Sequence, residues 1–276
     1  MKQKQSGTSA DKTSRRSIYI LPNLLTSASL FSGFYAIIAA IKGNYQAAAV
    51  AILIAGILDG LDGRVARWTL TTSRFGMEYD SLADLVAFGV APGILAFMWG
   101  LQDYGRLGWL AAFLYVATTA LRLARFNTLS QSSNSSTRDY YFLGLPCPSA
   151  AAVLATSVLL CQHFGIFGPV RHVAVLIIVY GLSFLMVSNV RYYSFKEIRW
   201  LQQHPFSGMV VLILAIMVVA MEPKVTLFVL IATYVISGPV LMPLRALRPK
   251  SLRYGAEHHI KDVSHSRDEE IKENER

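Results

Sequence analysis

The chain has 276 residues and a formal net charge of +9, and 53% of its residues are hydrophobic while only 16% are charged. Because the apolar residues come in long blocks, this composition excludes an ordinary soluble protein and indicates an integral membrane protein. The basic balance therefore need not indicate a nucleic-acid-binding protein, since basic residues at a membrane surface contact anionic lipid headgroups and attract anionic substrates.

In chain order, residues 1–17 are polar and basic and are predicted to form a disordered tail. The stretch 18–41 contains no charged residue and is long enough to cross the hydrocarbon core. Further spans are predicted at residues 45–66, 80–101, 107–126, 146–164, 170–190, 206–221 and 224–244, of which 206–221 is the shortest. The sequence thus predicts an all-α, polytopic helical bundle of about eight transmembrane helices over residues 18–245, followed by a polar tail over 246–276.

The distribution of basic residues predicts the orientation of this bundle. Alternating the loops across the membrane places 22 of the 26 Lys and Arg residues on one side and only Lys42, Arg106, Arg171 and Lys224 on the other. Because cytoplasmic loops carry the excess of basic residues, both termini are predicted to be cytoplasmic. In a bacterium this would be a protein of the inner membrane. The two cysteines, Cys147 and Cys161, lie in or near predicted spans without ligand-like spacing, which favours packing roles over a disulfide or a metal site.

Four aspartates lie in segments that are otherwise apolar enough for a membrane: Asp59, Asp62, Asp80 and Asp84. Charged side chains in such segments are costly and mark functional sites. The members of each pair are three or four residues apart and so share one helix face, and a loop at about 68–75 lets the two helices run antiparallel with both pairs meeting. Converging carboxylates repel one another unless cations lie between them, which predicts one or two divalent ions, Mg²⁺ or Mn²⁺.

The aspartates and their neighbours follow the pattern D-x2-D-G-x2-A-R-x8-G-x3-D-x3-D, at Asp59, Asp62, Gly63, Ala66, Arg67, Gly76, Asp80 and Asp84. This pattern resembles the signature of the CDP-alcohol phosphatidyltransferase family. The resemblance implies a membrane enzyme with metal ions held by the four aspartates and Asp84 as the general base. It also implies a homodimer.

The resemblance further implies that CDP-diacylglycerol contacts residues from three segments: Asn23, Thr26, Gly63, Arg67, Ser73 and Gly76. The planar guanidinium of Arg67 suits a pyrophosphate, because it donates two parallel charge-assisted bonds. Pro22 is predicted to lie in the first turn of the first span. The role of the neighbouring Arg64 is left open, and Glu78 lies outside the pattern.

Two further stretches, RLARFN at residues 122–127 and GLPCP at 144–148, resemble the phosphatidylserine synthase branch of the family, as does VSNVRYYSFK at 187–196. That branch implies transfer of the phosphatidyl group from CDP-diacylglycerol to L-serine with release of CMP. We hypothesise that Arg122 or Arg125 pairs with the serine carboxylate, with Asn127 nearby. The alternative is that these residues have no role at the site and only reflect the usual excess of basic residues at cytoplasmic helix ends. Glycerol 3-phosphate, choline or inositol phosphate are alternative acceptors, and a cation-coupled transporter is the alternative from another class.

Overall fold

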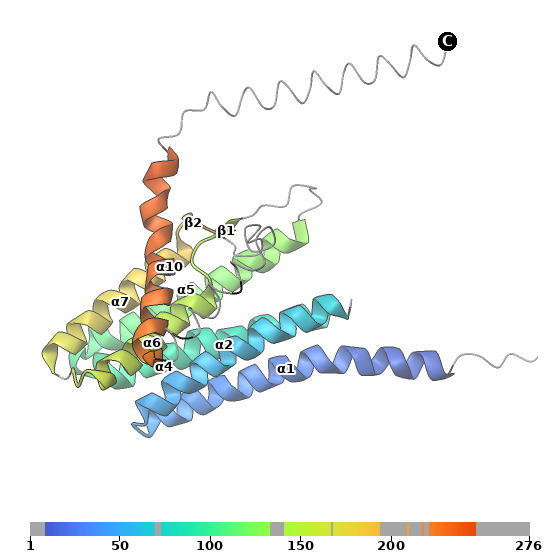
Figure 1. The fold of residues 1–276 in the computed structure, drawn as a ribbon, viewed down its shortest axis with the longest axis horizontal. Helices are drawn as coiled ribbons and strands as arrows, with labels where there is room; N and C mark the ends of the chain where they lie inside the picture. The colour runs from blue at the N-terminus through green and yellow to red at the C-terminus, as the bar shows by residue number, and fades with distance from the viewer. Residues whose placement is uncertain are drawn as a thin grey trace, which may run out of the picture. The chain divides into compact units, whose positions relative to one another are not determined.

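The computed structural model describes residues 9–69, 73–132, 141–166, 168–193, 209, 217 and 221–246. Within these residues the regular secondary structure is helical apart from one short strand pair (Figure 1). The all-α prediction is therefore confirmed except for this pair, β1 (Tyr141–Leu143) with β2 (Arg191–Tyr193), which are antiparallel. Each strand has three residues, so the pair ties two loops together and forms no layer of its own.

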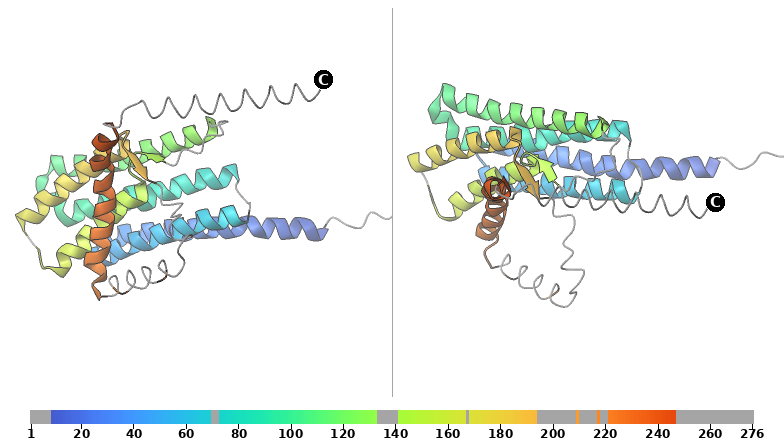
Figure 2. Two further views of the ribbon diagram at one scale, coloured as in Figure 1. Left: turned by 45° about the horizontal axis from the view of Figure 1, so that its top comes forward. Right: turned by 90° about the horizontal axis from the view of Figure 1, so that it is seen from above.

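Helices α1 (Ser9–Ile41) and α2 (Tyr45–Trp68) form an antiparallel hairpin and lie side by side in all views (Figure 2). Asn44 caps α2 by accepting a hydrogen bond from the Ala47 amide at 3.2 Å. Buried serines of α1 donate to backbone carbonyls of α2: Ser29 to Ala55 at 3.0 Å and Ser32 to Ala51 at 2.8 Å. Such bonds require close approach of the two backbones, which the alanines permit.

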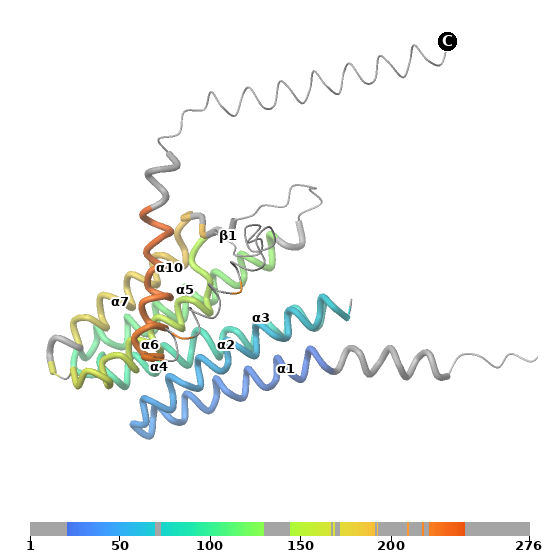
Figure 3. Tube along the Cα trace, viewed as in Figure 1, coloured from blue at the N-terminus to red at the C-terminus, as the bar shows by residue number. Residues whose placement is uncertain are grey.

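The next rod runs without a break from Arg74 to Tyr104 and can be followed in Figure 3. It consists of α3 (Arg74–Asp84), the π-helical η1 (Leu85–Val90), α4 (Ala91–Ala96), the π-helical η2 (Phe97–Leu101) and η3 (Gln102–Tyr104). A π segment leaves carbonyl groups outside the regular α-helical pattern. Two tyrosines bond to such carbonyls: Tyr115 donates to Phe88 at 3.2 Å, and Tyr45 donates to Met98 at 3.0 Å.

The second half of the bundle contains α5 (Arg106–Ser132), α6 (Cys147–His163) and α7 (Pro169–Val187), followed after a gap in the described residues by α10 (Pro223–Ala246). Gly144, at a φ of +79°, turns the chain from β1 towards α6, and its amide donates to the Val190 carbonyl at 2.9 Å. The buried Tyr192 hydroxyl donates to the Val235 carbonyl of α10 at 3.1 Å.

Within the described residues, four helical segments are long and apolar enough to cross a membrane: Leu21–Ile41, Arg74–Tyr104, Arg106–Leu129 and Pro223–Val240. Large apolar side chains on these segments are exposed, as at Phe31 and Phe113, which is expected of helices that face lipid. An integral membrane protein is thus supported. The other predicted spans fall on α2, on the shorter apolar helices α6 and α7, and on residues 206–221, of which the structure describes only Met209, Met217 and Met221.

Two details at the N-terminal end differ from expectation. Helix α1 begins at Ser9, earlier than the predicted start at residue 18, so Pro22 lies inside the helix and the prediction of a first-turn proline is wrong. Membrane helices tolerate an interior proline because neighbouring groups satisfy the freed backbone atoms. Most of the predicted tails, residues 1–8 and 247–276, lies outside the described residues.

Candidate active site

The four aspartates converge, as their spacing predicts, from the end of α2 and the start of the next rod. Ligand oxygens of Asp59, Asp62 and Asp80 all lie within 4.8 Å of one another. The Asp84 carboxyl is within hydrogen-bonding reach of Asp59. The predicted interhelical loop is also in place, because α2 ends at Trp68 and α3 begins at Arg74.

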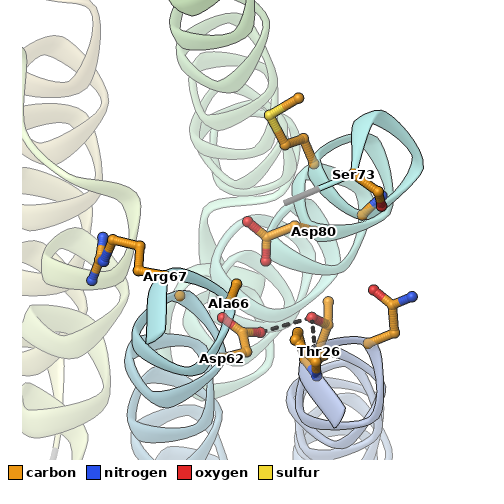
Figure 4. Close-up of a pocket in the computed structure, with 11 residues that line it drawn as sticks. Thr26, Asp62, Ala66, Arg67, Ser73 and Asp80 are labelled. Carbon is orange, nitrogen blue, oxygen red and sulfur yellow. Dashed lines mark hydrogen bonds between the residues drawn. The ribbon is translucent and has the colours of Figure 1, made fainter. Parts of the chain in front are cut away.

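Asp62 is the most buried of the four, with 4% of its surface exposed, and it has a specific partner. The Thr26 hydroxyl on α1 donates to Asp62 Oδ2 at 2.8 Å and lies 3.1 Å from the Pro22 carbonyl (Figure 4). Thr26 is itself buried. A charge-assisted bond of this kind fixes the rotamer of a buried carboxylate. Thr26 was predicted to contact the nucleotide, and the structure places it against the metal-ligand candidate as well as in the pocket described next.

A pocket of about 220 Å³ opens beside the aspartates, between α1, the end of α2 and the start of α3. Its lining includes all six residues predicted to contact CDP-diacylglycerol, together with Asp62, Asp80, Pro22, Ala66 and Met77. In Figure 4, Asp62 and Asp80 point towards each other, whereas Arg67 extends to one side from the last turn of α2. The pocket therefore has carboxylates at one wall and an exposed guanidinium at its rim.

The start of α3 is shaped by its cap. Ser73 is the N-cap residue, and its side chain accepts a hydrogen bond from the Gly76 amide at 2.9 Å. A Cβ at Gly76 would lie 3.1 Å from the Ser73 Oγ and 3.5 Å from Asn23 Oδ1, so glycine permits the close approach of α1 and α3. A Cβ at Gly63 would meet nothing within 4 Å, which leaves open space above α2 inside the pocket.

The predicted acceptor residues lie on α5, which reaches the same end of the bundle (Figure 1). The Asn127 amide donates to the Ser81 hydroxyl at 3.0 Å. Ser81 lies between Asp80 and Asp84 in the sequence. Arg125 is exposed and donates to Asn189 Oδ1 at 2.9 Å. Arg122 donates to Cys147 Sγ at 3.3 Å. The structure thus brings Asn127 to the aspartate rod and gives the two arginines different surroundings.

Several residues at the site were not singled out from the sequence. Tyr79 joins α3 to α1 through a hydroxyl–hydroxyl bond to Ser27 at 2.9 Å. Ser81 stands inside the aspartate pattern, and Asn189 stands inside the VSNVRYYSFK stretch, so position within a motif was an available signal for both. Cys147 was predicted to be a packing residue, and no spacing in the sequence points to its contact with Arg122.

The donor set of the cluster fits a hard divalent cation. Three carboxylate oxygens can meet at one point, and Mg²⁺ and Mn²⁺ prefer such oxygen ligands. The cluster also lacks a basic partner of its own, since no Lys or Arg salt bridge to these aspartates is found among the described residues. A cation is the simplest counter-charge for them.

Comparisons with known proteins agree with the resemblance that the sequence pattern indicates. The model of the CDP-alcohol phosphatidyltransferase family matches residues 19–187. A Helicobacter pylori (strain ATCC 700392 / 26695) protein named CDP-diacylglycerol–serine O-phosphatidyltransferase is 38% identical over 221 residues, which cover 80% of this chain and 90% of the relative. A Mycobacterium leprae protein of the same name is 36% identical over 233 residues, which cover 82% of this chain and 76% of the relative. A Methanothermobacter thermautotrophicus protein named archaetidylserine synthase is 34% identical over 178 residues, which cover 64% of this chain and 70% of the relative.

Proposed function

Because this chain belongs to the CDP-alcohol phosphatidyltransferase family, we propose that it transfers the phosphatidyl group of CDP-diacylglycerol to the hydroxyl group of L-serine and releases CMP. The observation that carries this proposal is the convergence of Asp59, Asp62 and Asp80 beside a pocket lined by the six residues that the family resemblance assigns to the nucleotide lipid. The names of the three relatives all contain serine, which favours serine as the acceptor.

The donor half of the reaction takes place in the pocket between α1, α2 and α3. One or two Mg²⁺ or Mn²⁺ ions at the four aspartates would neutralise the pyrophosphate and stabilise the CMP leaving group. Arg67 at the rim donates to the phosphates, and the Ser73 hydroxyl is within the same lining. The remaining wall is formed by Asn23, Thr26, Gly63 and Gly76, and the open space at Gly63 leaves room for the nucleotide.

The acceptor half lies between Asp84 and α5. Asp84 takes the proton of the serine hydroxyl as that hydroxyl attacks the phosphorus atom and CMP leaves. Of the two arginines, we assign Arg122 to the serine carboxylate, because Arg125 is exposed and already bonded to Asn189. Asn127 holds α5 against the aspartate rod through Ser81.

We propose eight spans, both termini in the cytoplasm and an active site that opens on the cytoplasmic side, as the excess of basic residues on one side supports. The acyl chains would then stay in the bilayer while serine arrives from the cytosol. The homodimer remains a prediction, tested by the mass of the detergent-solubilised protein.

The direct test supplies purified full-length protein in detergent with labelled serine, CDP-diacylglycerol and Mn²⁺ or Mg²⁺. We expect equimolar labelled phosphatidylserine and CMP, no reaction after chelation, and recovery on adding back either ion. Titrating the two ions separately shows which is used. Absence of serine-dependent CMP release under all these conditions would overturn the proposal.

Two outcomes point to the alternatives. CMP release with glycerol 3-phosphate, inositol phosphate or choline but not with serine would keep the chemistry and reject the acceptor. Cation-coupled uptake into proteoliposomes without CMP formation would replace the enzyme by a transporter that uses the same acids.

A further inference from the structure

The guanidinium of Arg122 lies in an unusual environment between α5 and the start of α6. Its Nη1 donates to Cys147 Sγ at 3.3 Å, and its Nε is buried without a hydrogen-bond partner among the residues that the structure describes. A guanidinium carries five N–H donors, a thiol is a weak acceptor, and a buried donor without an acceptor is costly. The protein therefore orients the Arg122 side chain but leaves a buried N–H donor of its guanidinium without an acceptor among the described residues.

Arg122 lies on α5, the helix that is bonded to the aspartate rod. Helix α5 is bonded to the aspartate rod through Asn127 and Ser81, five residues further along the helix from Arg122. No carboxylate among the described residues forms an ion pair with Arg122, so its positive charge remains available to an anion.

The position of the thiol is fixed by backbone bonds and not by the side chain itself. Cys147 is the first residue of α6 and is fully buried. Just before it, the Gly144 amide donates to the Val190 carbonyl at 2.9 Å, and the Leu145 amide donates to the Leu185 carbonyl at 3.1 Å. Removing the thiol should therefore free the Arg122 guanidinium without moving the start of α6.

We propose that Cys147 is a positioning residue for the acceptor: its thiol holds the Arg122 guanidinium in the direction from which the serine carboxylate arrives. A carboxylate at position 147 would pair with Arg122 and cancel its attraction for an anionic substrate, whereas a neutral, weak acceptor orients the group and leaves its charge intact. This inference rests on the proposed function, because it presumes that Arg122 binds the acceptor.

The test compares Cys147→Ala and Cys147→Ser with Cys161→Ala in the full-length protein. Cys161 is the matched control, since it is the other cysteine, lies on the same helix and is half-buried. We expect Cys147→Ala to raise KM for serine by roughly 3- to 10-fold, the usual range for losing one such hydrogen bond, with kcat and KM for CDP-diacylglycerol unchanged. Cys147→Ser, which keeps an acceptor, should recover most of the loss, and Cys161→Ala should match the wild type.

A double variant shows whether the effect passes through Arg122. On an Arg122→Lys background, Cys147→Ala should cause no further rise in KM for serine, because coupled residues are not additive. The inference would be overturned if Cys147→Ala raised KM for serine equally on both backgrounds, or if Cys147→Ala kept the wild-type KM for serine. It would also be overturned if KM rose in parallel for both substrates and the melting temperature fell. These results differ from failure of the proposed function, in which the wild-type protein itself releases no CMP with serine.

Discussion

The proposed donor side and the proposed acceptor side of the site are built in different ways. The donor side draws its carboxylates from a segment of 26 residues, 59–84, and places three of them within 4.8 Å of one another. The proposed acceptor side uses Arg122 of α5 and Cys147 of α6, which are joined by a single hydrogen bond, while Arg125 ties α5 to Asn189 in the segment after α7. Chemistry on a diphosphate requires clustered charge, which shows as a spacing pattern, whereas recognition of the acceptor depends on how distant segments pack.

The largest expected effect lies where the two sides meet, at Asp84. Removing a general base by Asp84→Asn should lower serine-dependent CMP release by about 10²- to 10⁴-fold while KM for CDP-diacylglycerol stays within a few-fold. Steady-state kinetics in detergent measure both. Glu78→Gln is the control, since Glu78 is an exposed acid of the same helix that lies outside the cluster. Wild-type turnover in Asp84→Asn would remove the proposed base.

The acceptor side is tested by comparing its two arginines. Arg122→Lys should raise KM for serine by about 10- to 100-fold, which corresponds to losing a charge-assisted bond of about 1.5–3 kcal/mol. Arg125→Lys should change it less than about 3-fold, because an exposed side chain bonded to Asn189 is easily replaced. KM for CDP-diacylglycerol reports on the donor side and should stay constant in both. The reverse ranking of the two arginines would move the carboxylate site to Arg125.

The donor side should weaken when Asp62 loses its partner. Thr26→Val keeps the shape of the side chain but removes the hydroxyl that donates to Asp62, and we expect activity to fall about 10-fold with a higher half-activating concentration of Mn²⁺. Thr118→Val is the matched control, because that buried hydroxyl donates, within the part of the chain that the structure describes, to the Tyr115 carbonyl of its own helix. Equal losses in the two variants would indicate a general packing effect.

The smallest effect separates two glycines of α2. A Cβ at either Gly60 or Gly63 would meet nothing within 4 Å, but only Gly63 lines the pocket. Gly63→Ala should therefore raise KM for CDP-diacylglycerol by roughly 2- to 5-fold, whereas Gly60→Ala should leave it unchanged and add up to about 1 kcal/mol of helix stability. Melting temperatures and KM values distinguish the two. Equal KM values would mean that the lipid does not approach Gly63.

Much of the donor side could be predicted from the sequence. The loop between α2 and α3 lies where it was expected, and the six residues expected to contact the nucleotide line one pocket, because the family pattern and helical periodicity specify residues that share one face. Their contact with the nucleotide stays a prediction. Periodicity could not show that Pro22 lies inside α1 or that α3 continues through π-helical segments, since both depend on packing with other helices. The choice between Arg122 and Arg125 likewise needed the partners Cys147 and Asn189, which are distant in the chain.

The two π-helical segments have a consequence for the long rod as a whole. In each, an amide bonds five residues back, as from Ala91 to Val86 and from Gln102 to Phe97, so the rod holds more residues per turn there than an α-helix does. One extra residue advances the helical phase by about 100°. Upstream of η1 the aspartates face α2, while at and beyond it Gly89 and Gly93 lie against Thr119 and Val116 of α5. The π turns thus rotate the helical phase between the aspartates and the glycines. If one residue were deleted from η1, the aspartates could not face α2 while Gly89 and Gly93 still packed against α5.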